Sequence, residues 1–196
     1  MIWSADDVTP AAGSFDWSFG WHAGDPYVLK ADEHEAFRDL WSALEKVRER
    51  IELAGALRRF TYALERTLPE DKIVDVMIAA ESLFFSDIGP KDRGEFRFRL
   101  STRVALLVGQ TPQERRQIAK FMRHAYDARS GTVHGGDPGE DNLRALDGTR
   151  VSAAECAAAL EDVLRRALQR ATLRLAGGER FPPDWEELMY GDLPSH

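Results

Sequence analysis

The sequence predicts an all-α fold, an up-and-down bundle of five to six main helices preceded by an irregular, aromatic N-terminal arm. Three observations lead to this prediction. Apolar residues recur at spacings of three and four from residue 32 onward, which is the period of one face of a helix. Capping sequences of the Ser/Thr-x-x-Glu type precede several of these stripes. Glycines or glycine–proline pairs follow them, as at many helix ends.

The 196 residues, 43% hydrophobic and 30% charged, fit one globular domain with a short extension. We expect an irregular arm at residues 1–31, a helical bundle at 32–178 and a C-terminal docking tail at 179–196. The arm has no regular periodicity, apart from a short strand expected near residues 27–29. Its aromatic residues are expected to wrap the bundle or cover a partner surface. They are Trp3, Phe15, Trp17, Phe19, Trp21 and Tyr27.

The first half of the bundle is expected to contain three helices. A first apolar stripe is followed by Gly55, after which a second stripe begins. Thr67 and Glu70 have the spacing of a capping box and predict the start of the third helix. The three stripes consist of Phe37, Leu40, Trp41, Leu44, Val47 and Ile51, then Leu57, Phe60, Leu64 and Leu68, then Ile73, Val76, Met77, Ala80, Leu83 and Phe84.

The next two helices are separated by a clear stop and start. Gly89-Pro90 predicts a turn, and a stripe from residue 96 to 107 ends at Gly109. Thr111 is expected to cap the following helix, with Pro112 at its first position. Glu114 would complete the capping box, and the core face would hold Ile118, Phe121, Met122 and Ala125.

Two further helical segments complete the prediction. Ser152 and Glu155 form a second capping box, which opens a long helix that extends to Gly177-Gly178. Residues 181–190 are expected to form a short helix docked by its aromatic side chains.

Several classes of protein are disfavoured by composition. The single cysteine, Cys156, excludes a disulfide framework, favours a reducing cytoplasm and is expected to be a small buried hydrophobe. No run of 18 apolar residues is present, and the N-terminus lacks a basic start, so we expect neither a membrane span nor a secretion signal. The histidines show no paired ligand spacing and no phosphate-binding loop is visible, so we expect no metal and no cofactor.

Charge is unevenly distributed along the chain. The net charge is −7, but residues 91–134 contain ten Lys or Arg and four acids, which gives +6 there and −13 elsewhere. A concentration of positive charge beside a site attracts a polyanion. A basic but merely solvated helical face explains the same pattern equally well.

Arg129 and His134 are the candidate catalytic pair. Arginine binds phosphate oxygens through two donors, and histidine can take and return a proton near neutral pH. Positions five apart on a helix point about 140° apart and stand roughly 7.5 Å apart along the axis. The helix must therefore distort near Gly131, or a second surface must complete the cleft, most simply a second copy of the chain. Alternatively, Arg129 pairs with a carboxylate and His134 lies at a helix end.

Six other residues are candidates for binding substrate or supporting the pair. They are Glu81, Arg99, Arg103, Asp127, Ser130 and Thr132. Helical spacing places Arg129 at the edge of the buried stripe, with Asp127 turned away from it. Arg99 and Arg103 share a face, which either meets Glu81 and Asp127 internally or offers two phosphate sites. The hydroxyls of Ser130 and Thr132 could hold substrate or cap the helix.

Three segments together resemble the HEPN domains (higher eukaryote and prokaryote nucleotide-binding), and most closely their ApeA-like, phage-defence-associated branch. The segments are AAESLF at 79–84, FRFRLSTRVALLVG at 96–109 and YDARSGTVHG at 126–135. In order and separation they are similar to the family's pattern, over about residues 57–175. The resemblance implies a helical bundle that dimerises and brings two Arg-x4-His motifs together to cut RNA.

The function expected from this resemblance is a metal-independent endoribonuclease acting as a homodimer in phage defence or toxin-type stress control. RNA is the expected substrate, and an antitoxin or an upstream domain is a possible partner. Two alternatives stay open. Gly135-Gly136 follows His134, where the family's toxins often have a further polar or aromatic residue, so the chain could be a non-catalytic module for nucleotide, RNA or protein. It could also be a structural domain in which Arg129 and Glu81 form a buried pair.

Overall fold

Two helical hairpins and a long central helix make up the fold. The computed structural model describes residues 29–88, 95–133 and 137–191, and within them seven α-helices, one 3₁₀ turn and no strand are present. The all-α bundle predicted from sequence is thereby confirmed. The aromatic arm, the strand near residues 27–29, the Gly89-Pro90 turn and His134 fall wholly or largely outside the described residues.

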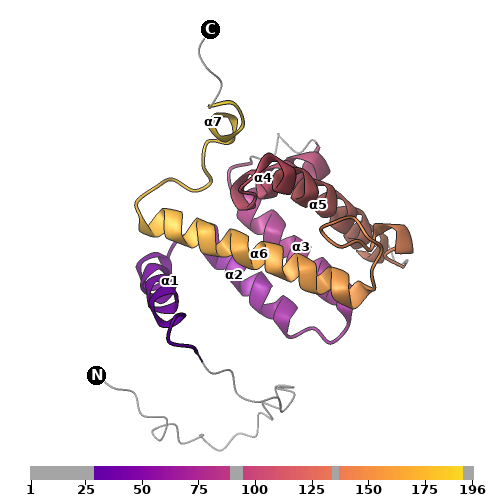
Figure 1. Ribbon diagram of the computed structural model, residues 1–196, viewed down its shortest axis with the longest axis horizontal. Helices are drawn as coiled ribbons and strands as arrows, with labels where there is room; N and C mark the ends of the chain where they lie inside the picture. Colours follow the sequence, from indigo (N-terminus) through magenta and orange to yellow (C-terminus); the bar gives the residue numbers. More distant parts are fainter. Residues whose placement is uncertain (1–28, 89–94, 134–136, 192–196) are drawn as a thin grey trace, which may run out of the picture.

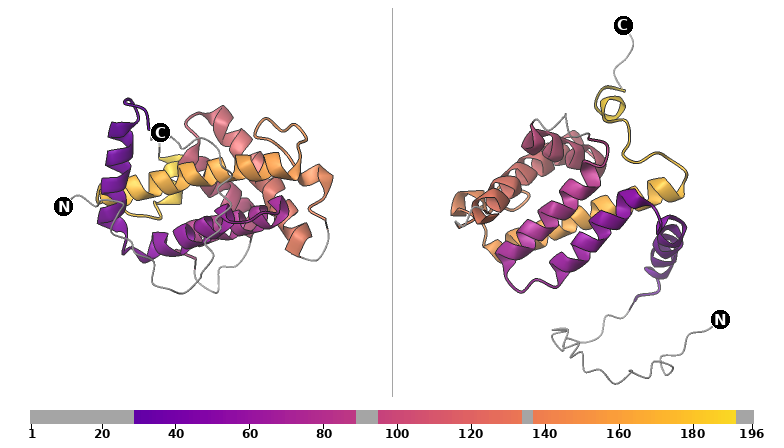
Figure 2. Two further views of the ribbon diagram at one scale, coloured as in Figure 1. Left: turned by 90° about the horizontal axis from the view of Figure 1, so that it is seen from below. Right: turned by 180° about the vertical axis from the view of Figure 1, so that it is seen from behind.

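The hairpins pack around the central helix. Helices α2 (Ile51–Leu64) and α3 (Pro69–Phe84) form the first hairpin, and α4 (Phe96–Val108) and α5 (Pro112–Val133) form the second. The long helix α6 (Ala153–Ala176) crosses α2 and α3, with the second hairpin beside it (Figure 1). The views from below and behind in Figure 2 show the α2–α3 hairpin covering one side of α6.

The remaining elements lie at the edges of this bundle. Helix α1 (His34–Val47) packs against α6 at one end of the molecule, and the short α7 (Trp185–Tyr190) contacts α4. A segment that includes the 3₁₀ turn Glu140–Asn142 connects α5 to α6 and lies against α5. None of the helices in the described ranges is long and apolar enough to cross a membrane.

The core forms where α3, α4, α5 and α6 meet. Its largest fully buried side chains include Phe84 of α3, Leu100 of α4, Phe121 of α5 and Leu160 of α6. Cys156 is fully buried as well, and burial raises the pKa of its thiol. The prediction that this cysteine is a small core residue is confirmed.

The N-terminal helices differ from the prediction. The expected stripe from Phe37 to Ile51 is divided between two helices, because α1 ends at Val47 and α2 begins at Ile51. Phe37 and Trp41 are 54% and 57% exposed, so these two members of the stripe face away from the core. Gly55 does not separate two helices but lies inside α2, where a Cβ atom would be 2.9 Å from the Ser82 hydroxyl oxygen. The side chain of Ser82 on α3 is therefore the neighbour that a larger residue at this position would meet.

Most of the expected helix starts and ends are confirmed, with one exception. The Thr111 hydroxyl accepts a hydrogen bond from the Glu114 amide (3.1 Å), and the Ser152 capping box is complete. Gly109 and Gly177 follow α4 and α6 directly. The capping box predicted at Thr67 is wrong, because Pro69 is the first helical residue and the cap position falls on Leu68, which makes no side-chain cap.

Candidate functional site

Arg129 lies in the penultimate turn of α5 and faces α3. Its Nη2 atom is 3.4 Å from Oε2 of Glu81, and the two side chains are 24% and 25% exposed. The ring of Tyr126, one turn earlier on α5, has its centroid 5.8 Å from the guanidinium carbon. The Nε atom of Arg129 is buried and has no hydrogen-bond partner among the described residues. The guanidinium group therefore has a carboxylate neighbour but does not use all of its donors.

The surroundings of Arg129 raise the pKa values of two neighbouring side chains. Burial raises the pKa of the Glu81 carboxyl, and the positive charge of Arg129 only partly opposes this. Burial also raises the pKa of the Tyr126 phenol, with a further contribution from the negative charge of Glu81. The two raised pKa values indicate a partly enclosed, poorly solvated site. In such a site an arginine binds an anion more strongly than in water.

The chain returns to α5 immediately after the helix ends. A Cβ atom at Gly131 would lie 2.8 Å from the carbonyl oxygen of Asp137, so the returning segment touches the last turn of the helix. His134 is outside the described residues, but it lies in sequence between Val133 and Asp137, and both of these are positioned at this end. Val133 and Asp137, the described residues on either side of this segment, therefore both lie at the last turn of α5.

The hydroxyl-bearing candidates Ser130 and Thr132 lie in the last turn of α5. The Thr132 hydroxyl donates to the carbonyl oxygen of Ala128 (3.2 Å), so its proton is used within the helix. Ser130 is half-buried. The alternative expectation, that these hydroxyls cap the helix, is not seen for Thr132, which bonds back along α5.

Asp127 faces away from Arg129, as its helical position predicts. Its two carboxylate oxygens accept hydrogen bonds from Arg97 of α4, at 2.7 Å and 2.6 Å. This pair joins the start of α4 to the end of α5 and leaves Glu81 as the carboxylate beside Arg129.

Arg103 does not meet Glu81 or Asp127, so the first of the two alternatives stated for the α4 arginines is not seen for this residue. It donates to the carbonyl oxygen of Phe84 (2.6 Å) and to both carboxylate oxygens of Asp87 (2.7 Å and 3.0 Å). Its guanidinium carbon also lies 5.1 Å from the ring centroid of Trp185. These contacts connect α3, α4 and the C-terminal tail, so Arg103 has a structural role. Arg99, one turn earlier, is half-buried.

Tyr126 is the member of the site that sequence reasoning did not select. The sequence contains a pattern that predicts this contact, because Tyr126 and Arg129 are three apart and therefore neighbours on a helix, and an arginine is attracted to the face of an aromatic ring. The carboxylate partners of the α4 arginines were less accessible from sequence, since Asp87 lies beyond the end of α3 and its position depends on how the helices cross.

Comparison of the chain with protein-family models, with curated proteins and with solved structures gives no match.

Proposed function

We propose that this protein is a metal-independent endoribonuclease of the HEPN type, with a composite active site at a homodimer interface, acting in phage defence or a toxin-type stress response. The proposal rests on the resemblance of residues 79–84, 96–109 and 126–135 to that family. The observation that supports it best is the position of Arg129, which is poorly solvated, keeps an unused Nε donor and lies four residues before Val133, the last described residue ahead of His134.

In the proposed reaction, the 2′-hydroxyl of a ribose attacks the adjacent phosphorus and the bond to the 5′-oxygen breaks. One His134 removes the proton from the 2′-hydroxyl, and His134 of a second chain donates a proton to the leaving oxygen. Arg129 stabilises the additional negative charge on the phosphate oxygens in the transition state. The products are a 2′,3′-cyclic phosphate and a 5′-hydroxyl, and DNA, which lacks the attacking group, is not cut.

The surface around this end of the second hairpin supports a contact between two copies. Phe98 near the start of α4 and Val133 at the end of α5 are both 55% exposed. The Arg97–Asp127 pair shows that these two helix ends lie side by side. Apolar side chains exposed next to a site are typical of an interface.

The ion pair between Arg129 and Glu81 favours a second candidate, a non-catalytic module that binds nucleotide, RNA or a protein. The Glu81 carboxylate next to the guanidinium group already occupies a donor that the proposed transition state would need, which favours a role without catalysis. In this case His134→Ala leaves ligand binding unchanged, and neither form cuts RNA.

The test is incubation of the purified protein with a mixed RNA pool in EDTA, in parallel with Arg129→Ala, His134→Ala and the control Arg165→Ala. Arg165 lies on the surface of α6 and pairs with acids of its own helix. We expect cleavage by the wild type and the control alone, with 2′,3′-cyclic phosphate ends. Comparable cleavage of DNA, or equal cleavage by all four proteins, excludes the mechanism. Circular dichroism of each variant checks that loss of cleavage is not loss of fold.

A further inference from the structure

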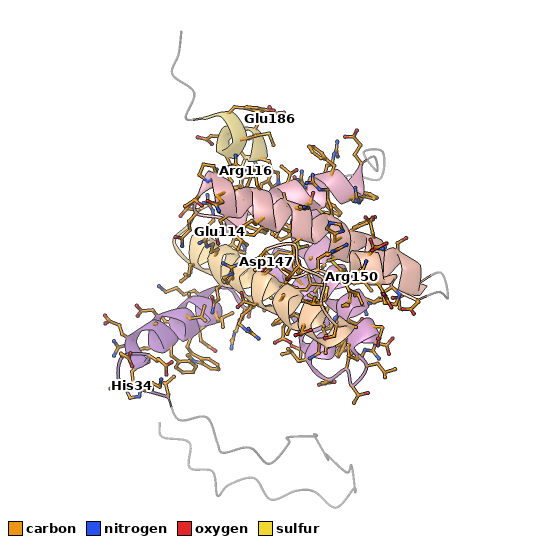
Figure 3. The ribbon with its side chains drawn as sticks, turned by 45° about the vertical axis from the view of Figure 1, so that its right-hand side comes forward. His34, Glu114, Arg116, Asp147, Arg150 and Glu186 are labelled. Atoms are coloured by element: carbon orange, nitrogen blue, oxygen red, sulfur yellow. The ribbon has the colours of Figure 1, made fainter. Side chains whose placement is uncertain are left out.

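A pocket lies on another face of α5, away from Arg129. It has a volume of about 210 Å³ and lies between α5 and the turn at residues 145–148. Arg116, Lys120 and His124 of α5 line it at spacings of four residues, which places them in one row along the helix. Asp147 lines it from the turn, and Figure 3 labels both Arg116 and Asp147. His124 and Arg129 point about 140° apart around the helix, so this pocket is separate from the Arg129 site.

The turn that closes the pocket is held by its own hydrogen bonds. The Gly148 amide donates to the carbonyl oxygen of Ala145 (3.0 Å), and the Ala145 amide donates to that of Thr149 (2.9 Å). Gly148 has a φ of 91°, which favours glycine at this position. Leu143, just before the turn, is buried in the core. The protein's own contacts therefore hold this wall of the pocket in place without a ligand.

The charge in the pocket favours an anion. Within the described residues, neither Arg116 nor Lys120 forms an ion pair. The Asp147 carboxylate accepts hydrogen bonds from the amide and the hydroxyl of Thr149 (2.8 Å and 2.7 Å), which lower the pKa of that carboxyl. Asp147 thus stays ionised and is engaged by its own turn, while two cations beside it remain available to a ligand.

His124 adds a polar group without a partner. Its Nδ1 atom is buried and makes no hydrogen bond to any described residue. Burial and the nearby cations Arg144, Lys120 and Arg97 lower the pKa of this imidazole, and only Asp127 opposes them. An anion in the pocket would offset these positive charges and favour the protonated ring.

The size of the pocket limits the ligand. A volume of about 210 Å³ corresponds to roughly seven water molecules, which is less than most sites for drug-sized ligands offer. It accommodates a phosphate group with a small organic group attached, next to the apolar wall formed by Phe121 and Leu146. A terminal phosphate fits such a half-enclosed pocket better than an internal phosphodiester, which continues as a chain on both sides.

We propose that this pocket binds a terminal phosphate monoester, with Arg116 and Lys120 contacting the phosphate oxygens and His124 completing the site. The phosphate could belong to a small sugar phosphate or to the 5′ end of an RNA strand, since the recognised group is the same. The site does not depend on the ribonuclease proposal, because it lies on a different face of α5 and uses none of the candidate catalytic residues.

Calorimetric titration of the full chain tests this with three probes: ribose 5-phosphate, and a short 2′-O-methyl RNA with either a 5′-phosphate or a 5′-hydroxyl. The 2′-O-methyl groups prevent cleavage through the 2′-oxygen, so binding is measured without the proposed reaction. We expect Arg116→Gln and Lys120→Gln each to weaken binding about tenfold, and the α6 control Arg165→Gln to leave it unchanged. Preference for the phosphorylated RNA over ribose 5-phosphate identifies an RNA end, and equal binding identifies a small phosphate.

A second readout follows the histidine itself. In proton NMR the His124 ring signal should titrate at a higher pH when ribose 5-phosphate or the phosphorylated RNA is present. Equal affinity for the two RNA probes without binding of ribose 5-phosphate overturns the proposal, as does binding that Arg116→Gln and Lys120→Gln leave unchanged. Absence of binding to every probe overturns it as well.

Discussion

Arg103 connects three parts of the molecule through one guanidinium group. It is 14% exposed, bonds to Phe84 and Asp87 at the end of α3, and lies beside the ring of Trp185 in the tail. Arg103→Met should lower the free energy of unfolding by about 2–4 kcal/mol, because it leaves a buried carbonyl and a carboxylate without their donor. Urea unfolding followed by circular dichroism measures this loss.

Arg97 provides the matched control for this prediction. It lies on the same helix and also binds a carboxylate through two donors, but its pair with Asp127 is more exposed. Arg97→Met should cost less than about 1 kcal/mol, as expected for a surface ion pair. Equal losses in the two variants would show that the contacts with Phe84 and Trp185 add nothing.

Glu81 makes stability depend on pH in a direction set by burial. Its pKa is raised above 4.5 in the folded chain, so the unfolded chain loses this proton first as the pH rises. The wild type should therefore lose stability relative to Glu81→Gln as the pH rises above 4.5. Urea unfolding of both proteins across this range tests the sign. A relative gain by the wild type would mean that the attraction to Arg129 outweighs burial.

At the scale of elements, the last turn of α5 depends on a glycine. A Cβ atom at Gly131 would meet the backbone oxygen of Asp137 at 2.8 Å, and this contact can be relieved only by moving the returning chain. Gly131→Ala should therefore destabilise the protein by about 1–3 kcal/mol, although alanine favours a helix by about 1 kcal/mol. Thermal unfolding checks the sign.

Gly55→Ala is the control, because Gly55 is also inside a helix but faces the Ser82 hydroxyl, which can rotate away. The stability of this variant should equal that of the wild type or slightly exceed it, because of the same gain in helix propensity. A loss at Gly55 as large as at Gly131 would contradict the distinction between a side-chain and a backbone neighbour.

The elements best predicted from sequence are those with a local start signal. Ser152 and Thr111 bond to amides three residues ahead, so four consecutive residues contain the information, and both caps are present. The break between α1 and α2 could not be predicted from a local signal. The apolar stripe continues across it, and a stripe alone does not show which of its side chains pack against another helix. Arg129 was likewise placed correctly at the edge of the core, whereas the partner of Arg103 depended on where α3 ends.

At the scale of the whole molecule, charge separation sets how RNA would approach. Residues 91–134 carry +6 while the remainder carries −13, and the described part of that basic segment is α4 and α5. An RNA strand should therefore be drawn to the second hairpin and kept from the acidic remainder, and its binding should weaken with salt.

The composite site predicts how activity falls when intact and inactive chains are mixed. We consider a double variant, Arg129→Ala with His134→Ala, added to an equal amount of wild type and left to exchange subunits. If each site needs residues from both chains, only dimers of two intact chains cut RNA, and these are about a quarter of the total. Activity per total dimer should then be about a quarter of that of pure wild type. Half of the wild-type activity would show instead that each chain carries a complete site and that the dimer, if formed, is not required for cleavage. An equal mixture with the surface variant Arg165→Ala should keep full activity.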